Sequence, residues 1–272
     1  MMSAAGPMTV TVSRLEIIRE RLVLAGYLAK MEFKRRYAST SGGALWMFLS
    51  PLLSIFTIWI ALDVGLSASG RFGSEFGVTF AVGLAAWLFF TEVTQTAVSS
   101  ITSNAHLVKK VVFPVWVVPL SVGLAALVVH LFVLCAVIFA IHLTGITFSL
   151  GLLVLPLWIA ALLAVSFAVG LWVASLNVRS RDTAIVTGNI IALGFWLTPI
   201  VWPLKQLSET WKGIALVNPI AVIIEGYRSS LGVGDTELGP KEWLVFLCVC
   251  AAILAAAGST YRRNRAAFAD SL

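Results

Sequence analysis

The stretch that decides the fold is Trp116–Leu143, WVVPLSVGLAALVVHLFVLCAVIFAIHL, in which no residue is Asp, Glu, Lys or Arg. An α-helix rises 1.5 Å per residue, so about 20 consecutive apolar residues are needed to cross the hydrocarbon core of a bilayer, about 30 Å thick. This stretch is therefore long enough to cross a membrane as one helix. It predicts a transmembrane span.

Outward from this span, other apolar runs of similar length occur on both sides. They are Ala44–Leu62, Gly77–Val98, Leu150–Leu176, Thr183–Pro203 and Glu242–Tyr261, the second of which turns polar after Phe90. The whole chain is 59% hydrophobic and 12% charged, whereas soluble domains are about 45–50% apolar and about 25% charged. The predicted fold class is an all-α polytopic membrane protein with six transmembrane helices. We expect residues 44–272 to form this membrane domain and residues 1–43 a cytoplasmic tail with an interface helix.

The basic residues define the orientation, because cytoplasmic loops carry an excess of Lys and Arg. Placing both termini in the cytoplasm puts 14 of the 19 basic residues inside, and the other five are Arg71, Lys205, Lys212, Arg228 and Lys241. Since these charges flank apolar spans, the net charge of +6 is explained by topology. We expect membrane lipid around the chain and no nucleic-acid partner.

The segment before the first span has a different character. Leu15–Tyr37 mixes apolar positions with Arg, Lys and Glu, which makes it too charged to insert and suits a helix lying at the headgroup interface. An ordinary solvated helix is the alternative. Ser39–Gly43 separates this helix from the first span.

Two further segments outside the spans are predicted to form short helices or a hairpin. Ile101–Lys110, closed by Pro114, predicts a short amphipathic cytoplasmic helix that can transmit force from a soluble partner, the alternative being a plain loop. Residues 204–241 contain two apolar pieces, each too short to cross, on either side of Asn218-Pro219. They predict an external re-entrant hairpin, because irregular backbone at membrane depth is tolerated only beside protein or a water-filled cavity. Such a hairpin suggests a mouth or gate.

The sequence contains no motif typical of nucleotide binding, metal binding or catalysis. It contains no G-x-x-x-x-G-K-[ST] motif, and His106, His130 and His142 lack metal-ligand spacing. The three cysteines lie in apolar runs and indicate neither zinc nor disulfides. His130 is a functional candidate because it falls within a span, although a hydrogen-bonded neutral imidazole is the simpler interpretation. We expect no catalytic residues, no metal and no cofactor in this chain.

Aromatic residues offer a path for a sugar, because a flat ring matches the apolar C–H face of a pyranose without fixing a hydrogen-bond register. The aromatic and acidic residues predicted to line a channel are Trp59, Trp87, Phe89, Phe90 and Glu92. The alternative for each aromatic residue is an interfacial belt or a lipid-facing position.

Four segments, in order, resemble the membrane subunits of type-two ABC exporters for polysaccharides, the O-antigen, capsule and teichoic acid permeases. Arg35-Arg36-Tyr37 followed by Gly43-Ala44-Leu45-Trp46 and Ser50-Pro51 resembles the basic interface helix entering the first span. NAHLVKKVVFP at 104–114 is similar to the cytoplasmic coupling segment. Arg181-Asp182 with Trp196–Ile200 resembles the fourth loop and fifth span, and Asn218-Pro219 with Glu225–Arg228 the external hairpin.

The resemblance implies a homodimer in the bacterial inner membrane, with two copies of a separate ATPase that carries the ATP and Mg, and a lipid-linked glycan as substrate. It assigns ATPase coupling to Ser103, Asn104, His106, Lys109 and Lys110, and an external gate to Asn218, Pro219, Glu225, Tyr227 and Arg228. Lys34, Arg35 and Arg36 would meet the diphosphate of the lipid carrier, since cationic groups near the cytoplasmic surface attract anionic headgroups and Arg pairs with phosphate in a bidentate manner.

Two other functions stay open at this point. The same fold can export a drug or a lipid, because the sugar assignment depends on the resemblance and on the aromatic residues. A stand-alone membrane enzyme or a secondary carrier is the third hypothesis. Secondary carriers usually show internal repeats and charged sites at the membrane midplane, and neither is found in this sequence.

Overall fold

The computed structural model describes residues 14–37, 42–66, 76–106, 114–147, 150–202, 204, 207–234 and 238–271, and their regular secondary structure is helical throughout. The predicted all-α class is confirmed for these residues. The helices are α1 (Arg14–Tyr37), α2 (Ala44–Leu66), α3 (Phe76–Ser103), α5 (Val117–Leu143), the 3-10 helix η2 (Leu150–Val154), α6 (Leu155–Asn177), α7 (Asp182–Leu197), α8 (Glu209–Ala215), α9 (Pro219–Ser230) and α10 (Pro240–Ser271).

Five of the described helical segments are long and apolar enough to cross a membrane. They are Leu45–Leu62, Phe76–Ser103, Val117–Leu143, Leu150–Asn177 and Pro240–Arg265. The remaining predicted span corresponds to α7, whose 16 residues extend over about 24 Å at 1.5 Å per residue. Its predicted end at Pro203 lies beyond the observed end, because Thr198 precedes Pro199 and adopts an extended conformation (φ −90°, ψ 140°).

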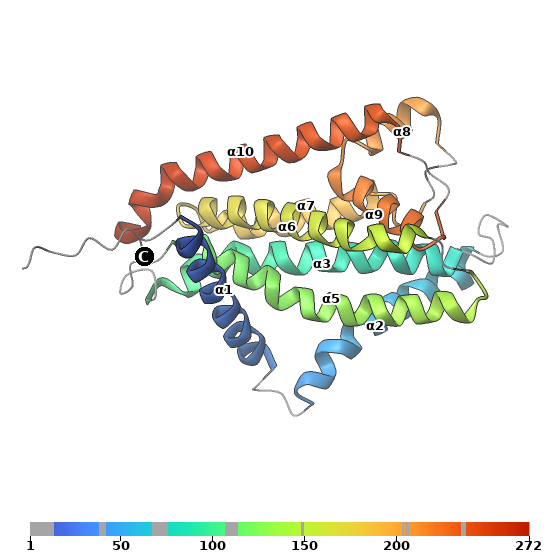
Figure 1. Ribbon diagram of the computed structural model, residues 1–272, viewed down its shortest axis with the longest axis horizontal. Helices are drawn as coiled ribbons and strands as arrows, with labels where there is room; N and C mark the ends of the chain where they lie inside the picture. The colour runs from blue at the N-terminus through green and yellow to red at the C-terminus, as the bar shows by residue number, and fades with distance from the viewer. Residues whose placement is uncertain are drawn as a thin grey trace, which may run out of the picture.

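Helix α3 is the centre of the bundle. It packs against α2, α5, α6, α7 and α9, and Figure 1 shows it running along the middle of the molecule. Small residues permit the close approach to α6, since a Cβ added at Gly170 would lie 2.9 Å from the Cβ of Ala97. Because α3 is surrounded by these helices, its side chains contact other helices at both ends of the bundle.

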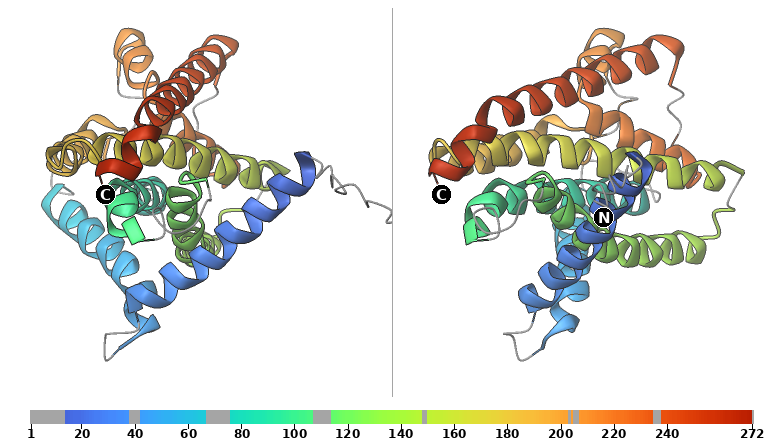
Figure 2. Two further views of the ribbon diagram at one scale, coloured as in Figure 1. Left: turned by 90° about the vertical axis from the view of Figure 1, so that its left-hand side faces the viewer. Right: turned by 60° about the vertical axis from the view of Figure 1, so that its left-hand side comes forward.

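The two ends of the bundle differ. α1 and the C-terminal parts of α3 and α10 lie at one end, and α8, α9 and the start of α3 lie at the other (Figure 1). α1 crosses the bundle obliquely, as Figure 2 shows. It packs on α5, burying Ala25 and Ala29 while exposing Leu15, Leu22 and Met31. An interfacial helix requires such exposed apolar side chains.

Both predicted short segments have structure in the described residues. In the segment predicted to be cytoplasmic, Ile101–Ser103 form the last turn of α3, Asn104 is a turn, and Ala105 and His106 are again helical. Lys109 and Lys110 lie outside the described residues. In the other, α8 and α9 stand on either side of Asn218-Pro219, where the Asn218 side chain accepts a hydrogen bond from Ile220 N at 3.0 Å and caps α9.

Candidate functional site

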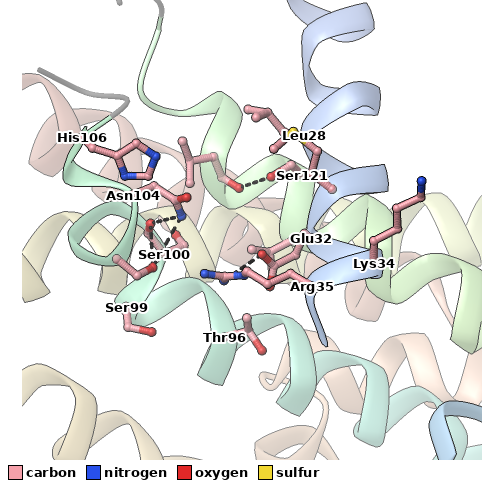
Figure 3. A pocket seen from close by; sticks show the side chains of 14 residues that line it. Leu28, Glu32, Lys34, Arg35, Thr96, Ser99, Ser100, Asn104, His106 and Ser121 are labelled. Carbon is pink, nitrogen blue, oxygen red and sulfur yellow. Dashed lines mark hydrogen bonds and ion pairs between the residues drawn. The ribbon is translucent and has the colours of Figure 1, made fainter. Parts of the chain in front are cut away.

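A cavity of about 590 Å³ opens between α1, α3 and α5 at the end of the bundle that carries α1. We call it the inner cavity; Figure 3 shows its lining. The side chains around it come from all three helices and the start of the predicted coupling segment. They are Leu28, Met31, Glu32, Lys34, Arg35, Thr96, Ser99, Ser100, Ser103, Asn104, His106, Val118, Ser121 and Val122.

One wall of the inner cavity is made of hydroxyl groups. Each of Thr96, Ser99, Ser100 and Ser103 lies three residues from one of the others and four from another, so they share one face of α3. Ser100 also anchors the end of the helix, because its carbonyl accepts from Ser103 Oγ (3.2 Å) and from Asn104 Nδ2 (2.8 Å). The sequence analysis did not predict Thr96, Ser99 and Ser100 as site residues, although their helical spacing is visible in the sequence.

The opposite wall brings in two of the basic residues predicted to bind the carrier headgroup. Arg35 donates to Glu32 Oε2 at 2.8 Å, and its side chain is still 59% exposed. In Figure 3 the Arg35 guanidinium projects from α1 toward α3, whereas Lys34 points the other way. The inner cavity therefore joins predicted headgroup residues to the predicted coupling residues Ser103, Asn104 and His106.

The third predicted headgroup residue, Arg36, is engaged elsewhere. Its Nε donates to Glu32 Oε1 at 3.1 Å, and its Nη1 forms an ion pair with Glu92 Oε1 on α3. Arg36 has a side-chain exposure of only 18%. The sequence assigned Arg36 and Glu92 to different roles, and the structure brings them into direct contact.

The predicted aromatic path divides into separate groups. Trp87 packs against Phe90 (ring centroids 5.5 Å apart) and Phe195 (6.2 Å), and Phe89 packs against His130 (4.9 Å). Trp59 lies on α2, where it contacts Phe56 at 5.9 Å. Trp87 and Phe89 are buried. Their assignment to a channel stays a prediction.

At the other end of the bundle, α9 is anchored by a buried ion pair. Arg228 Nη1 donates to Glu225 Oε1 at 2.7 Å, and both side chains are at most 4% exposed. The same guanidinium donates to three backbone carbonyls, those of Thr79 (3.2 Å), Pro199 (2.8 Å) and Ile200 (3.1 Å). Arg228 thus ties α9 to the start of α3 and to the chain that follows α7.

Two further hydrogen bonds hold the same region. Asn218 Nδ2 donates to Thr198 Oγ1 at 2.9 Å. Tyr227 OH lies 3.0 Å from His130 Nε2 on α5. Burial raises the pKa of the Tyr227 hydroxyl above its usual range, so it stays protonated and can donate to His130. All five residues predicted for the external gate therefore belong to α9: Asn218 caps it, Pro219 is its first residue, and Glu225, Tyr227 and Arg228 follow within it.

A small cavity lies between the Arg36–Glu92 pair and the His130–Tyr227 hydrogen bond. Glu92, which pairs with Arg36, lines a small cavity of about 20 Å³ together with His130, which bonds to Tyr227. These residues come from α1, α3, α5 and α9. His130, considered only as a functional candidate from sequence, bonds to Tyr227 and lines this small cavity.

Five membrane-length apolar helices among the described residues define a multi-pass membrane protein. A profile of the ABC-2 type transporter family matches residues 24–231, more than half of the chain, and the chain belongs to this family. It is a transport subunit of an ABC transporter in the bacterial inner membrane, and a permease of this kind implies an ATPase partner.

Three curated relatives match nearly the whole chain. The O-antigen export system permease protein RfbA of Myxococcus xanthus is 26% identical over 264 residues, covering 95% of this chain and 100% of the relative. Two proteins of the same name from Klebsiella pneumoniae are 26% and 25% identical over 247 residues, each match covering 90% of this chain and 93% of the relative.

Proposed function

We propose that this chain is the membrane subunit of an ATP-driven exporter that moves a lipid-linked polysaccharide of the O-antigen or capsule type out of the cytoplasm. The observation that carries the proposal is the match of nearly the whole chain to three permeases named for O-antigen export. The working unit would be a homodimer bound to two copies of the ATPase. Each chain would have six spans and both termini inside, with α7 as the fifth span in chain order.

The geometry supports a division of tasks along the bundle. The inner cavity offers a cation and a row of hydroxyl groups, which together suit the phosphates of a lipid carrier. Ser103, Asn104 and His106 border the same cavity, so a displacement of the coupling segment by the ATPase would reach the carrier site directly. The ion pair and hydrogen bonds around Arg228 would hold the external gate.

Deleting the gene in its native host tests the exporter function. The expected result is loss of the surface polysaccharide with accumulation of its lipid-linked precursor inside the cell, restored by the wild-type chain. Surface polysaccharide that persists at the wild-type level in the deletion strain would overturn the proposal. A strain that loses resistance to a drug, and keeps its polysaccharide, would favour the drug-exporting alternative.

Arg35→Ala tests the carrier site most cleanly. Arg35 lines the inner cavity and bonds only to Glu32 among the described residues, whereas replacing Arg36 would also break the contact with Glu92. Export should fall while the complex with the ATPase still purifies intact. Arg19→Ala is the matched control, because Arg19 is an exposed arginine of α1 that does not line the inner cavity. Equal export by the two variants would refute the carrier-binding role.

A further inference from the structure

A second cavity, of about 410 Å³, lies at the opposite end of the bundle from the inner cavity. It is lined by η2, the start of α6, α9 and the start of α10. We call it the outer cavity. Its size falls within the range of about 300–1,000 Å³ typical of small-molecule sites. None of the roles assigned so far uses this cavity as a binding site.

An aromatic pair forms one wall of the outer cavity. Trp158 on α6 and Trp243 on α10 stack with ring centroids 5.2 Å apart and planes 24° apart. Trp158 is only 5% exposed, whereas Trp243 is 37% exposed. Phe246 stands edge-on to both rings and fixes their orientation. The pair therefore presents Trp243 as a rigid, accessible aromatic surface.

The other wall is polar and belongs to α9. Glu225, Ser229 and Ser230 all line the cavity. Glu225 uses Oε1 to accept from Arg228, and within the described residues its second carboxylate oxygen makes no hydrogen bond. Gly226 lies between these groups and the aromatic pair, and a Cβ added there would overlap the Trp158 ring. A glycine at 226 thus lets the polar wall approach the aromatic wall.

The charges of this site select a neutral ligand. Glu225 is the single ionisable residue of the described lining, and Arg228 neutralises it at 2.7 Å. The guanidinium is committed to that carboxylate and to three backbone carbonyls, which leaves it poorly placed to receive a phosphate. An acyl chain would leave the second oxygen of the Glu225 carboxylate and the serine hydroxyls without partners, at a cost in free energy.

We propose that the outer cavity binds a neutral sugar unit, with the pyranose face on Trp243 and the ring hydroxyls on Glu225 and Ser229. This inference rests on the proposed export of a polysaccharide and adds a saccharide site at the outward end. The site would hold the emerging glycan after each transport step. It differs from the inner cavity, whose exposed arginine suits the phosphate of the carrier.

Calorimetry and fluorine NMR on the full-length chain in lipid nanodiscs test the site. The probe is the polysaccharide released from the native host's surface by mild acid, which removes the lipid carrier. Labelling with 5-fluorotryptophan should show saturable shifts at Trp243. Trp243→Ala should weaken binding by about tenfold or more, and Trp243→Phe should stay within about threefold of wild type, because the ring face is retained.

Trp211→Ala is the matched control, since Trp211 is an exposed tryptophan of α8 that does not line the cavity. Ser229→Ala removes an exposed hydroxyl of the cavity lining and leaves the Glu225–Arg228 pair intact; it should also weaken binding, and it serves as the second variant if Trp243→Ala does not fold. Wild-type affinity in the Trp243→Ala protein, or shifts confined to other tryptophans, would overturn the proposal.

If gene deletion abolishes the surface polysaccharide and the probe still does not bind at Trp243, the saccharide site alone is wrong. If deletion leaves the polysaccharide in place, the exporter function itself is wrong.

Discussion

Replacing Arg228 by methionine should destabilise the protein strongly, because this residue joins α9 to the rest of the bundle. The substitution leaves Glu225, 3% exposed, as a buried charge without its partner, which costs about 3–5 kcal/mol in comparable cases. The carbonyls of Thr79, Pro199 and Ile200 each lose a charged donor as well. Since such terms are not additive, we expect a loss of at least about 3 kcal/mol in the free energy of unfolding.

The assay is unfolding of the full-length chain in mixed micelles, followed by tryptophan fluorescence. The double variant Glu225→Gln, Arg228→Met removes both charges, so it should recover about 1–3 kcal/mol relative to Arg228→Met alone. An Arg228→Met protein within about 1 kcal/mol of wild type would refute the anchoring role. So would a double variant that is no more stable than the single one.

Two other predictions follow from close contacts between helices. Gly226→Ala should cost about 1–3 kcal/mol in the free energy of unfolding, because the new methyl group overlaps the Trp158 ring. Gly188→Ala on α7 is the control, since a Cβ there has nothing within 4 Å and should not destabilise the protein. Equal effects of the two substitutions in the same micelle assay would contradict the packing. Arg36→Gln should separate α1 from α3, since it removes the ion pair with Glu92, and spin-label distances between the two helices should broaden. Arg35→Gln leaves that pair intact, and a similar broadening in that variant would show that the pair does not hold α1.

The apolar runs were sufficient to predict most of the helices. Trp116–Leu143 lacks charges and emerges as α5. The polar second half of the second run continues as helix to Ser103, where Thr96, Ser99, Ser100 and Ser103 line the inner cavity and Thr102 donates to a carbonyl of its own helix. The fifth run was predicted too long, since hydropathy continues past Leu197 while the Thr198-Pro199 step ends the helix.

The candidate sites depend on contacts that no local pattern shows. Arg36 and Glu92 are 56 residues apart, and Trp158 meets Trp243 only because α6 and α10 pack together. The cluster around α9 was predicted as a group, because Asn218-Pro219 and Glu225–Arg228 are close in sequence. Its partners Thr79 on α3 and Pro199 in the turn after α7 are far away in sequence, so the tertiary fold was needed to identify them.

Side-specific cysteine labelling tests the central claim, that the inner cavity faces the cytoplasm and the α8–α9 end faces outward. In a variant with Cys135, Cys248 and Cys250 replaced, single cysteines are placed at Lys109 and at Lys212 and exposed to a membrane-impermeant maleimide on spheroplasts. We predict that Lys212→Cys is labelled in intact spheroplasts, whereas Lys109→Cys is labelled only after the membrane is opened. Labelling of both positions from the same side would contradict the account.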